Sequence, residues 1–132
     1  MTLKTRWLDR RIAAPGPYLA LCLSEAEFVA TMRHCKIAQP SAWIKTDHAH
    51  ATAHYLQNPG GELVCVVCLR EWEGRDPIEV AGLLVHEAVH AWQEYADRIG
   101  EHFPGREQEA YAVQSIAQEL MAEFARRMGV RP

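Results

Sequence analysis

The stretch PIEVAGLLVHEAVHAWQEYADRI, residues 77–99, decides the expected fold. Asp76 before Pro77 is typical of a helix start, and Gly100 is placed to end the helix. The apolar residues of this stretch recur at helical spacing and cover more than half of the circumference: Ala81, Leu84, Val85, Ala88, Ala91, Trp92, Tyr95 and Ala96. The sequence therefore predicts a largely buried helix at the centre of the fold.

The narrow polar strip of this helix carries His86 and His90. Because they are four residues apart, their imidazoles lie one turn apart along the axis and differ by about 40° around it. Both can reach one metal ion, and Gly82 leaves open space one turn earlier. Glu87 points about 100° away from His86, toward the edge of the same cleft. Histidine, glutamate and histidine at this spacing supply two ligands and the general base of a catalytic zinc site.

The preceding half of the chain predicts one helix and a β-hairpin. Ser24 and Glu27 have the form of a capping box, which predicts a helix that runs to about Ile37. Two runs rich in β-branched and alternating residues, 43–56 and 62–69, are joined by QNPGG, which is typical of a turn. We expect the segment that ends at Pro15-Gly16-Pro17 to be irregular, and YLALCL after it to be core structure.

A last helix is expected over about residues 106–128 and is ended by Gly129. The expected order is helix, two strands, helix, helix. The fold class is therefore predicted as α+β, with a small antiparallel or mixed sheet packed on the central helix and a C-terminal helix that carries glutamates. A chain of 132 residues has room for one compact core, so residues 1–132 are expected to form one domain.

A catalytic zinc site needs a third protein ligand, and the last helix offers two candidates. Its apolar face is centred on residues such as Val113, Ala117 and Leu120. Glu109 lies about 60° from the centre of that face, and Glu107 about 100° from it on the other side. A carboxylate that meets the central helix should lie close to the packing face. Glu109 is therefore preferred as the third ligand, and Glu107 stays an alternative.

These paired motifs resemble a known group of enzymes. HEAVH, followed by eighteen residues and then by Glu109 in the context EQEAYAVQ, is similar to the gluzincin branch of the zincin metallopeptidases, especially its minimal single-domain members. It also resembles small peptidases encoded by phages and prophages. The resemblance covers roughly residues 50–125. It implies a minimal zincin-like fold and a peptide-bond hydrolase.

Carried over residue by residue, the resemblance makes His86, His90 and Glu109 ligands of one Zn²⁺ ion, and Glu87 the general base and later proton shuttle. It also implies an edge strand above the cleft, against which an extended peptide can pair. Residues 53–56 or their hairpin partner are the candidates for that strand. The chain departs from the pattern because it lacks a large second lobe and an evident oxyanion stabiliser. Tyr111 points about 160° away from Glu109, which leaves His102 or a strand residue for this role.

Composition argues against several other classes of protein. The formal net charge is −3 and the arginines are scattered, so nucleic acid is not expected as a partner. No stretch approaches the roughly 20 apolar residues of a membrane span, so no membrane partner is expected either. Four cysteines are too few for a disulfide scaffold, and a reduced, cytoplasmic location is predicted.

Two further groups of residues have the composition of metal sites. Cys65 and Cys68 have knuckle spacing, but residues three apart on a strand point to opposite faces, so we interpret both as small buried hydrophobes. His48, His50 and His54 share strand parity and are expected as a polar stripe that faces solvent or lines the cleft. Nothing nearby completes a second ligand set, so a second metal is not predicted.

The leading hypothesis is a zinc-dependent metallopeptidase that cuts a peptide or amide bond in a peptide or protein substrate. A second hypothesis is a zinc-containing binding or structural module with little or no turnover, because so small a chain builds only a shallow cleft. A third is a metal-free helical interaction domain. The oligomeric state and the cleaved bond are left open.

Overall fold

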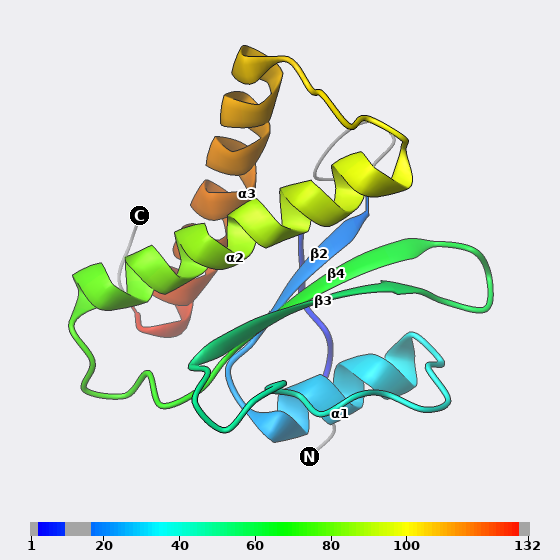
Figure 1. Ribbon diagram of the computed structural model, residues 1–132. Coiled ribbons are helices and arrows are strands. Elements are labelled where there is room, and N and C mark those ends of the chain that lie inside the picture. The colour runs from blue at the N-terminus through cyan, green and yellow to red at the C-terminus, as the bar shows by residue number, and fades with distance from the viewer. Residues whose placement is uncertain (1–2, 10–16, 130–132) are drawn as a thin grey trace.

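The computed structural model describes residues 3–9 and 17–129 (Figure 1). Part of the N-terminal segment that was expected to be irregular, residues 10–16, lies outside the described residues. The fold is α+β, with a mixed four-stranded sheet and three helices. In chain order the elements are β1 (Trp7–Asp9), β2 (Tyr18–Cys22), α1 (Glu25–His34), β3 (Ala51–Gln57), β4 (Leu63–Leu69), α2 (Pro77–Arg98) and α3 (Arg106–Arg127).

The sheet has the strand order β1-β2-β4-β3, so β3 lies at one edge and β1 at the other. β1 is antiparallel to β2, β2 is parallel to β4, and β4 is antiparallel to β3. The register pairs Ala53 with Val67 in the hairpin and Cys22 with Cys68 between the two inner strands. The strands β2 and β4 are buried in the middle, and this order leaves one backbone edge of β3 available to a further strand.

The predicted hairpin is present, but its first strand is shorter than expected. β3 begins at Ala51, so residues 43–50 do not form part of the strand. The turn closes through Asn58, whose side-chain oxygen accepts from the backbone N–H of Glu62 at 2.8 Å. Gly61 in this turn has a φ of +86°, which glycine adopts without the steric cost of a side chain.

The residues Tyr18–Cys22, expected only as core, form the strand β2, and Trp7–Asp9 form an edge strand that the sequence pattern did not indicate. β1 pairs with β2, the next strand in the chain, but the second partner of β2 is distant in sequence. β2 pairs with β4, which lies more than forty residues later in the chain. Such a pairing leaves no local turn signal, because its partner is chosen only in the folded chain.

The helices cover both faces of the sheet, α2 and α3 on one side and α1 on the other (Figure 1). Alternate residues of β4 divide between the two layers, as strand geometry requires. Cys65, Val67 and Leu69 pack with α2 and α3. Val64, Val66 and Cys68 pack in the layer of α1. The two faces of the sheet therefore belong to two separate hydrophobic clusters.

The helix predictions are confirmed to within a few residues. Ser24 caps α1 by accepting from the backbone N–H of Glu27 at 3.2 Å. Asp76 caps α2 by accepting from the backbone N–H of Ile78 at 2.7 Å. The first helix ends at His34 rather than at about Ile37. Within the described part of the chain, no helix combines the length and apolarity that a membrane span needs.

Candidate metal centre

The geometry of the candidate centre starts with His86 and His90 on the exposed face of α2. Their Nε2 atoms lie 3.1 Å apart, and their ring planes meet at 74°. Two imidazole nitrogens bound to one tetrahedral zinc at 2.0–2.1 Å lie about 3.3 Å apart. The two side chains therefore already converge at nearly the spacing that a shared metal ion requires. Open space lies beside the preceding turn, where a Cβ on Gly82 would meet nothing within 4 Å.

Gln93 selects the ring nitrogen that His90 presents. Its side-chain oxygen lies 3.0 Å from Nδ1 of His90 and accepts the Nδ1 proton. In the neutral ring the Nε2 atom of His90 then carries a lone pair, which is directed toward His86. Metal-ligating histidines usually donate their other ring N–H to such an acceptor, which fixes the tautomer and the ring orientation. Gln93 thus occupies the place of an outer partner to a metal ligand.

Glu87 turns from the same helix toward the sheet and is only 5% exposed. Burial raises the pKa of its carboxyl, and this effect exceeds the opposing influence of His90 and His86. The backbone of Ala53 in β3 also hydrogen-bonds the carboxylate. Glu87 is therefore a buried carboxylate with an elevated basicity, held between the histidine pair and the edge strand.

A groove of about 310 Å³ runs between α2 and the edge strand β3. It brings the candidate ligands and the candidate base into one opening. The residues that line it are Lys45, Ala51, Thr52, Ala53, His86, Glu87, His90 and Glu94. The edge strand that the sequence expected within residues 53–56 or their hairpin partner is thus β3, and its partner β4 lies inside the sheet.

Every second residue of β3 directs its backbone N–H and C=O groups toward the groove. His50, just before the strand, accepts from the backbone N–H of Arg70 and so faces the neighbouring strand. Ala53 has the opposite parity and hydrogen-bonds Glu87, so its backbone faces outward. By the same alternation, Ala51 and Tyr55 direct their N–H and C=O groups outward as well. The outer edge of β3 therefore presents a row of backbone groups along the groove.

Glu109 and Glu107 lie in the exposed first turn of α3. A carboxylate oxygen of Glu109 accepts from the indole N–H of Trp92 at 2.9 Å, which ties the start of α3 to α2. Among residues 3–9 and 17–129, no group of three or more His, Cys, Asp or Glu side chains is placed to hold a metal ion. The structure thus brings together His86, His90 and Glu87, and it does not assemble either glutamate of α3 with the two imidazoles.

The groove also contains two charged residues that the sequence reasoning missed. Glu94 lies four residues after His90, and this one-turn spacing was the available signal. Lys45 comes from the loop before β3, and its positive charge lowers the pKa of Glu87 as a minor influence. Only the folded chain brings this loop to the helix. His102, considered above as an oxyanion stabiliser, lies in the loop after α2, with its Nδ1 atom 4.0 Å from Asp97.

The expectation for the histidine stripe is wrong. His54 is 2% exposed and neither faces solvent nor lines the groove. Its Nε2 atom lies 2.9 Å from the backbone oxygen of Trp43, and its ring stacks on Phe28 with centroids 4.7 Å apart. His50 lies before the strand and contacts Arg75, with Nδ1 of His50 3.0 Å from a guanidinium nitrogen. The stripe fails because His48 and His50 precede the strand, which begins at Ala51, and because His54 lies on the face of β3 that α1 covers.

The interpretation of Cys65 and Cys68 is confirmed. Both are fully buried and belong to different layers, Cys65 to that of α2 and Cys68 to that of α1. Their thiols therefore lie on opposite faces of β4 and cannot bind one ion together.

Comparison with known proteins finds no matching family model, no significantly similar curated protein and no significantly similar solved structure. The functional argument consequently depends on the site itself, because fold alone does not determine function.

Proposed function

We propose that this protein is a zinc-dependent peptidase of the gluzincin type, with a zincin-like arrangement of helix and edge strand. The observation that carries the proposal is the convergence of two imidazoles beside a buried glutamate, directly below a free strand edge. His86 and His90 supply the nitrogens, and Glu87 supplies the carboxylate. This combination matches the chemistry of metal-assisted hydrolysis.

The donor set fits two of the three protein ligands of a catalytic zinc ion. His86 and His90 would hold the ion through Nε2, with Gln93 fixing the tautomer of His90. Glu109 is the preferred third ligand because of the resemblance, while Glu107 and Glu94 are the alternatives. When bound, zinc supplies a Lewis acid that makes a water molecule acidic enough to lose its proton near neutral pH.

Glu87 acts as the general base in this proposal. Its carboxylate takes the proton of the attacking water and later gives it to the nitrogen of the departing amine. The burial that raises the pKa of this carboxyl makes it a stronger base than an exposed glutamate. The hydrogen bond from the Ala53 backbone fixes the carboxylate at the wall of the groove.

The substrate is an extended segment of a peptide or protein. Ala51, Ala53 and Tyr55 direct backbone groups outward, so such a segment can add to the sheet as a further strand. Lys45 lines the same groove as Glu87, and its ammonium group is the cation available to oppose negative charge on the substrate carbonyl oxygen. An extended backbone and a cleavable amide would thus lie together between β3 and α2.

Substitution of Glu87 by Gln tests this function. We expect the zinc content to stay near one ion per chain, because the substitution leaves both histidines in place. Cleavage of an unstructured protein such as casein should fall by about 10²- to 10⁴-fold, the usual contribution of a general base. Metal analysis and a fluorescent casein assay measure the two quantities.

Glu79→Gln is the matched control, because Glu79 lies on the same helix and pairs with Arg75 outside the groove. It should retain both zinc and cleavage. Undiminished cleavage by the Glu87→Gln variant would remove Glu87 from the proposed role.

A zinc-containing binding or structural module is the second candidate. It is favoured because the two imidazoles converge, while no group of three or more His, Cys, Asp or Glu side chains in the described residues is placed to hold a metal ion as a catalytic site requires. In that case zinc would raise the melting temperature of the wild-type protein, while no peptide would be cut. Cleavage that depends on added zinc and on Glu87 would exclude this candidate.

A further inference from the structure

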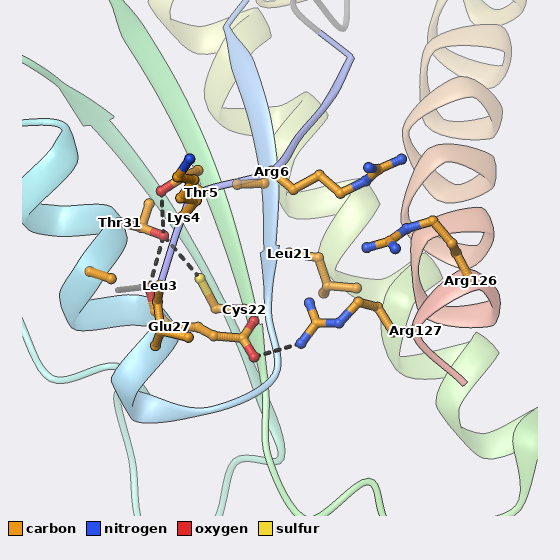
Figure 2. A pocket seen from close by; sticks show the side chains of 12 residues that line it. Leu3, Lys4, Thr5, Arg6, Leu21, Cys22, Glu27, Thr31, Arg126 and Arg127 are labelled. Carbon is orange, nitrogen blue, oxygen red and sulfur yellow. Dashed lines mark hydrogen bonds and ion pairs between the residues drawn. The ribbon is translucent and has the colours of Figure 1, made fainter. Parts of the chain in front are cut away.

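A cavity of about 230 Å³ lies far from the groove, between the N-terminal segment, β2, α1 and the end of α3 (Figure 2). Four basic side chains and one acidic side chain line it: Lys4, Arg6, Arg126, Arg127 and Glu27. Glu27 and Arg127 form an ion pair of 2.6 Å across one side. Cys22 lines the same cavity, with its sulfur 3.5 Å from Oγ1 of Thr31 (Figure 2).

Behind Cys22 lies a second thiol. Cys22 and Cys68 are register partners on the parallel strands β2 and β4, and both side chains face the layer of α1. Neighbouring strands are about 4.8 Å apart, and disulfides join Cα atoms about 4.4–6.8 Å apart. The register therefore places the two residues at the backbone separation that a disulfide requires. The pKa of each thiol is shifted by its interaction with the other.

The two thiols are chemically unequal. The interaction with Cys68 is the largest influence on the pKa of the Cys22 thiol and lowers it, and Thr31 and Arg127 lower it further. The net pKa is lowered although burial and Glu27 act in the opposite direction. Burial strongly raises the pKa of the Cys68 thiol. Cys22 is also the member of the pair that lines the cavity. Cys22 is therefore the thiol that an oxidant meets first, and Cys68 is its resolving partner.

We propose that Cys22 and Cys68 form a redox-active dithiol that small hydroperoxides oxidise to a disulfide through the basic cavity. This site is separate from the groove and does not depend on zinc.

The chemistry balances in two steps. The Cys22 thiolate attacks one oxygen of hydrogen peroxide, the O–O bond breaks, and the hydroxide released takes up the thiol proton as water. Cys22 is then a sulfenic acid. The sulfur of Cys68 attacks Sγ of Cys22, the S–O bond breaks, and the hydroxyl leaves with the Cys68 proton as a second water. Two thiols are oxidised, and one peroxide is reduced to two waters.

The chain provides two internal controls. Cys65 is fully buried in the other layer, and burial raises the pKa of its thiol to about 12. Cys35 follows α1 and is 4% exposed, and burial raises the pKa of its thiol as well. Neither residue lines the basic cavity. Oxidation should consequently select one pair among the four cysteines.

The experiment treats the full-length protein with hydrogen peroxide and maps its disulfides by mass spectrometry. We expect the mass to fall by about 2 Da and one crosslinked peptide to join Cys22 to Cys68. A reducing agent should restore both thiols. A bond that includes Cys35 or Cys65 would overturn the proposal. So would four intact thiols in the folded protein under conditions that oxidise the same protein in denaturant.

Two variants test the order of the steps. Cys68→Ser should leave a sulfenic acid on Cys22, which dimedone traps, while Cys22→Ser should leave Cys68 unlabelled by dimedone. Cys65→Ser is the matched control and should still form the disulfide. If dimedone labels Cys68 in the Cys22→Ser variant, the assigned order is wrong. The wild-type peptide map decides the proposal even if a buried serine destabilises a variant.

Discussion

The groove at the β3 edge and the basic cavity beside β2 use charged side chains in opposite ways. In the groove, His86 and His90 direct their nitrogens at one point, and the lining groups Lys45 and Glu94 are exposed. In the cavity, the arginines pair with acidic side chains of the protein, as Arg127 of α3 does with Glu27 of α1. Polar groups of the groove thus face an opening, whereas those of the cavity connect the N-terminal segment and α1 to α3.

Glu123 forms ion pairs with three arginines near the cavity, Arg6, Arg126 and Arg127. It is 5% exposed and accepts from Arg126 at 2.7 Å and from Arg6 at 3.1 Å. Burial alone would raise the pKa of its carboxyl, but the hydrogen bonds and charge of Arg126, with those of Arg6 and Arg127, lower it. A buried carboxylate of this kind supports the fold. The difference between the two regions is therefore one between polar groups that face an open groove and charged groups that satisfy one another.

The largest expected effect concerns Glu109, which the proposed function makes the third zinc ligand. We expect Glu109→Gln to weaken zinc binding by more than about 100-fold, because even outer partners of a ligand contribute 10- to 100-fold. The melting temperature of the metal-free protein should change little, since glutamine still accepts from Trp92. Zinc titration in competition with a chelator measures the affinity.

Glu107→Gln tests the alternative ligand on α3, because Glu107 lies in the same exposed turn as Glu109. Glu94→Gln tests the carboxylate that already lines the groove. If Glu94→Gln loses zinc and Glu109→Gln retains it, all protein ligands come from α2. The assignment of a ligand to α3 is then wrong.

In the cavity region, Glu123→Gln should lower the free energy of unfolding by about 2 kcal/mol at neutral pH, the usual contribution of hydrogen bonds between charged groups. The folded pKa of Glu123 is lowered, so its stabilisation is complete above the unfolded pKa of about 4.3 and is lost as pH falls below it. The difference between variant and wild type should therefore shrink in acid. Urea unfolding at pH 7 and pH 3 checks both statements, and zinc affinity should be unchanged.

The smallest effect concerns His54, the buried histidine on the strand that also carries Ala53. Burial lowers the pKa of its imidazole despite the hydrogen bond to the Trp43 carbonyl. Protonation is thus easier in the unfolded chain, so stability is complete above the unfolded pKa of about 6.5 and falls as pH drops below it. His54→Gln should flatten this decline between pH 7 and pH 5, measured by thermal unfolding.

The exposed His48 gives the matched variant, because His48→Gln should leave the pH dependence unchanged. An equal slope in wild type and His54→Gln would assign the acid sensitivity to other groups.

Much of the fold was accessible from local patterns. The apolar period and the Asp76-Pro77 start predicted α2 almost to the residue, and the QNPGG turn predicted the hairpin. The strand β1 was missed because it has only three residues, and the strand character of β2 was missed because its inner partner β4 is distant in sequence. The beginning of β3 was misplaced, since the alternation of residues 43–50 resembles a strand that the folded chain does not form.

The candidate site divides in the same way. His86, Glu87 and His90 share one helix, so their mutual placement followed from helical geometry. The contribution of Lys45 and the position of β3 over Glu87 depend on how a loop and a strand pack on that helix. The proximity of Cys22 and Cys68 could not be predicted either, because the sequence of neither strand indicates its register with a distant parallel strand.

By itself, the sequence determined the features in which side chains a few residues apart act together: the three helices, the hairpin, and a histidine pair with its neighbouring glutamate. Local backbone geometry is enough to place such groups. Only the tertiary structure decided which strand lies at the open edge, which loop charge enters the groove and which two cysteines meet. These arrangements follow from burying apolar faces against partners that are distant along the chain, and that choice is made by the whole core.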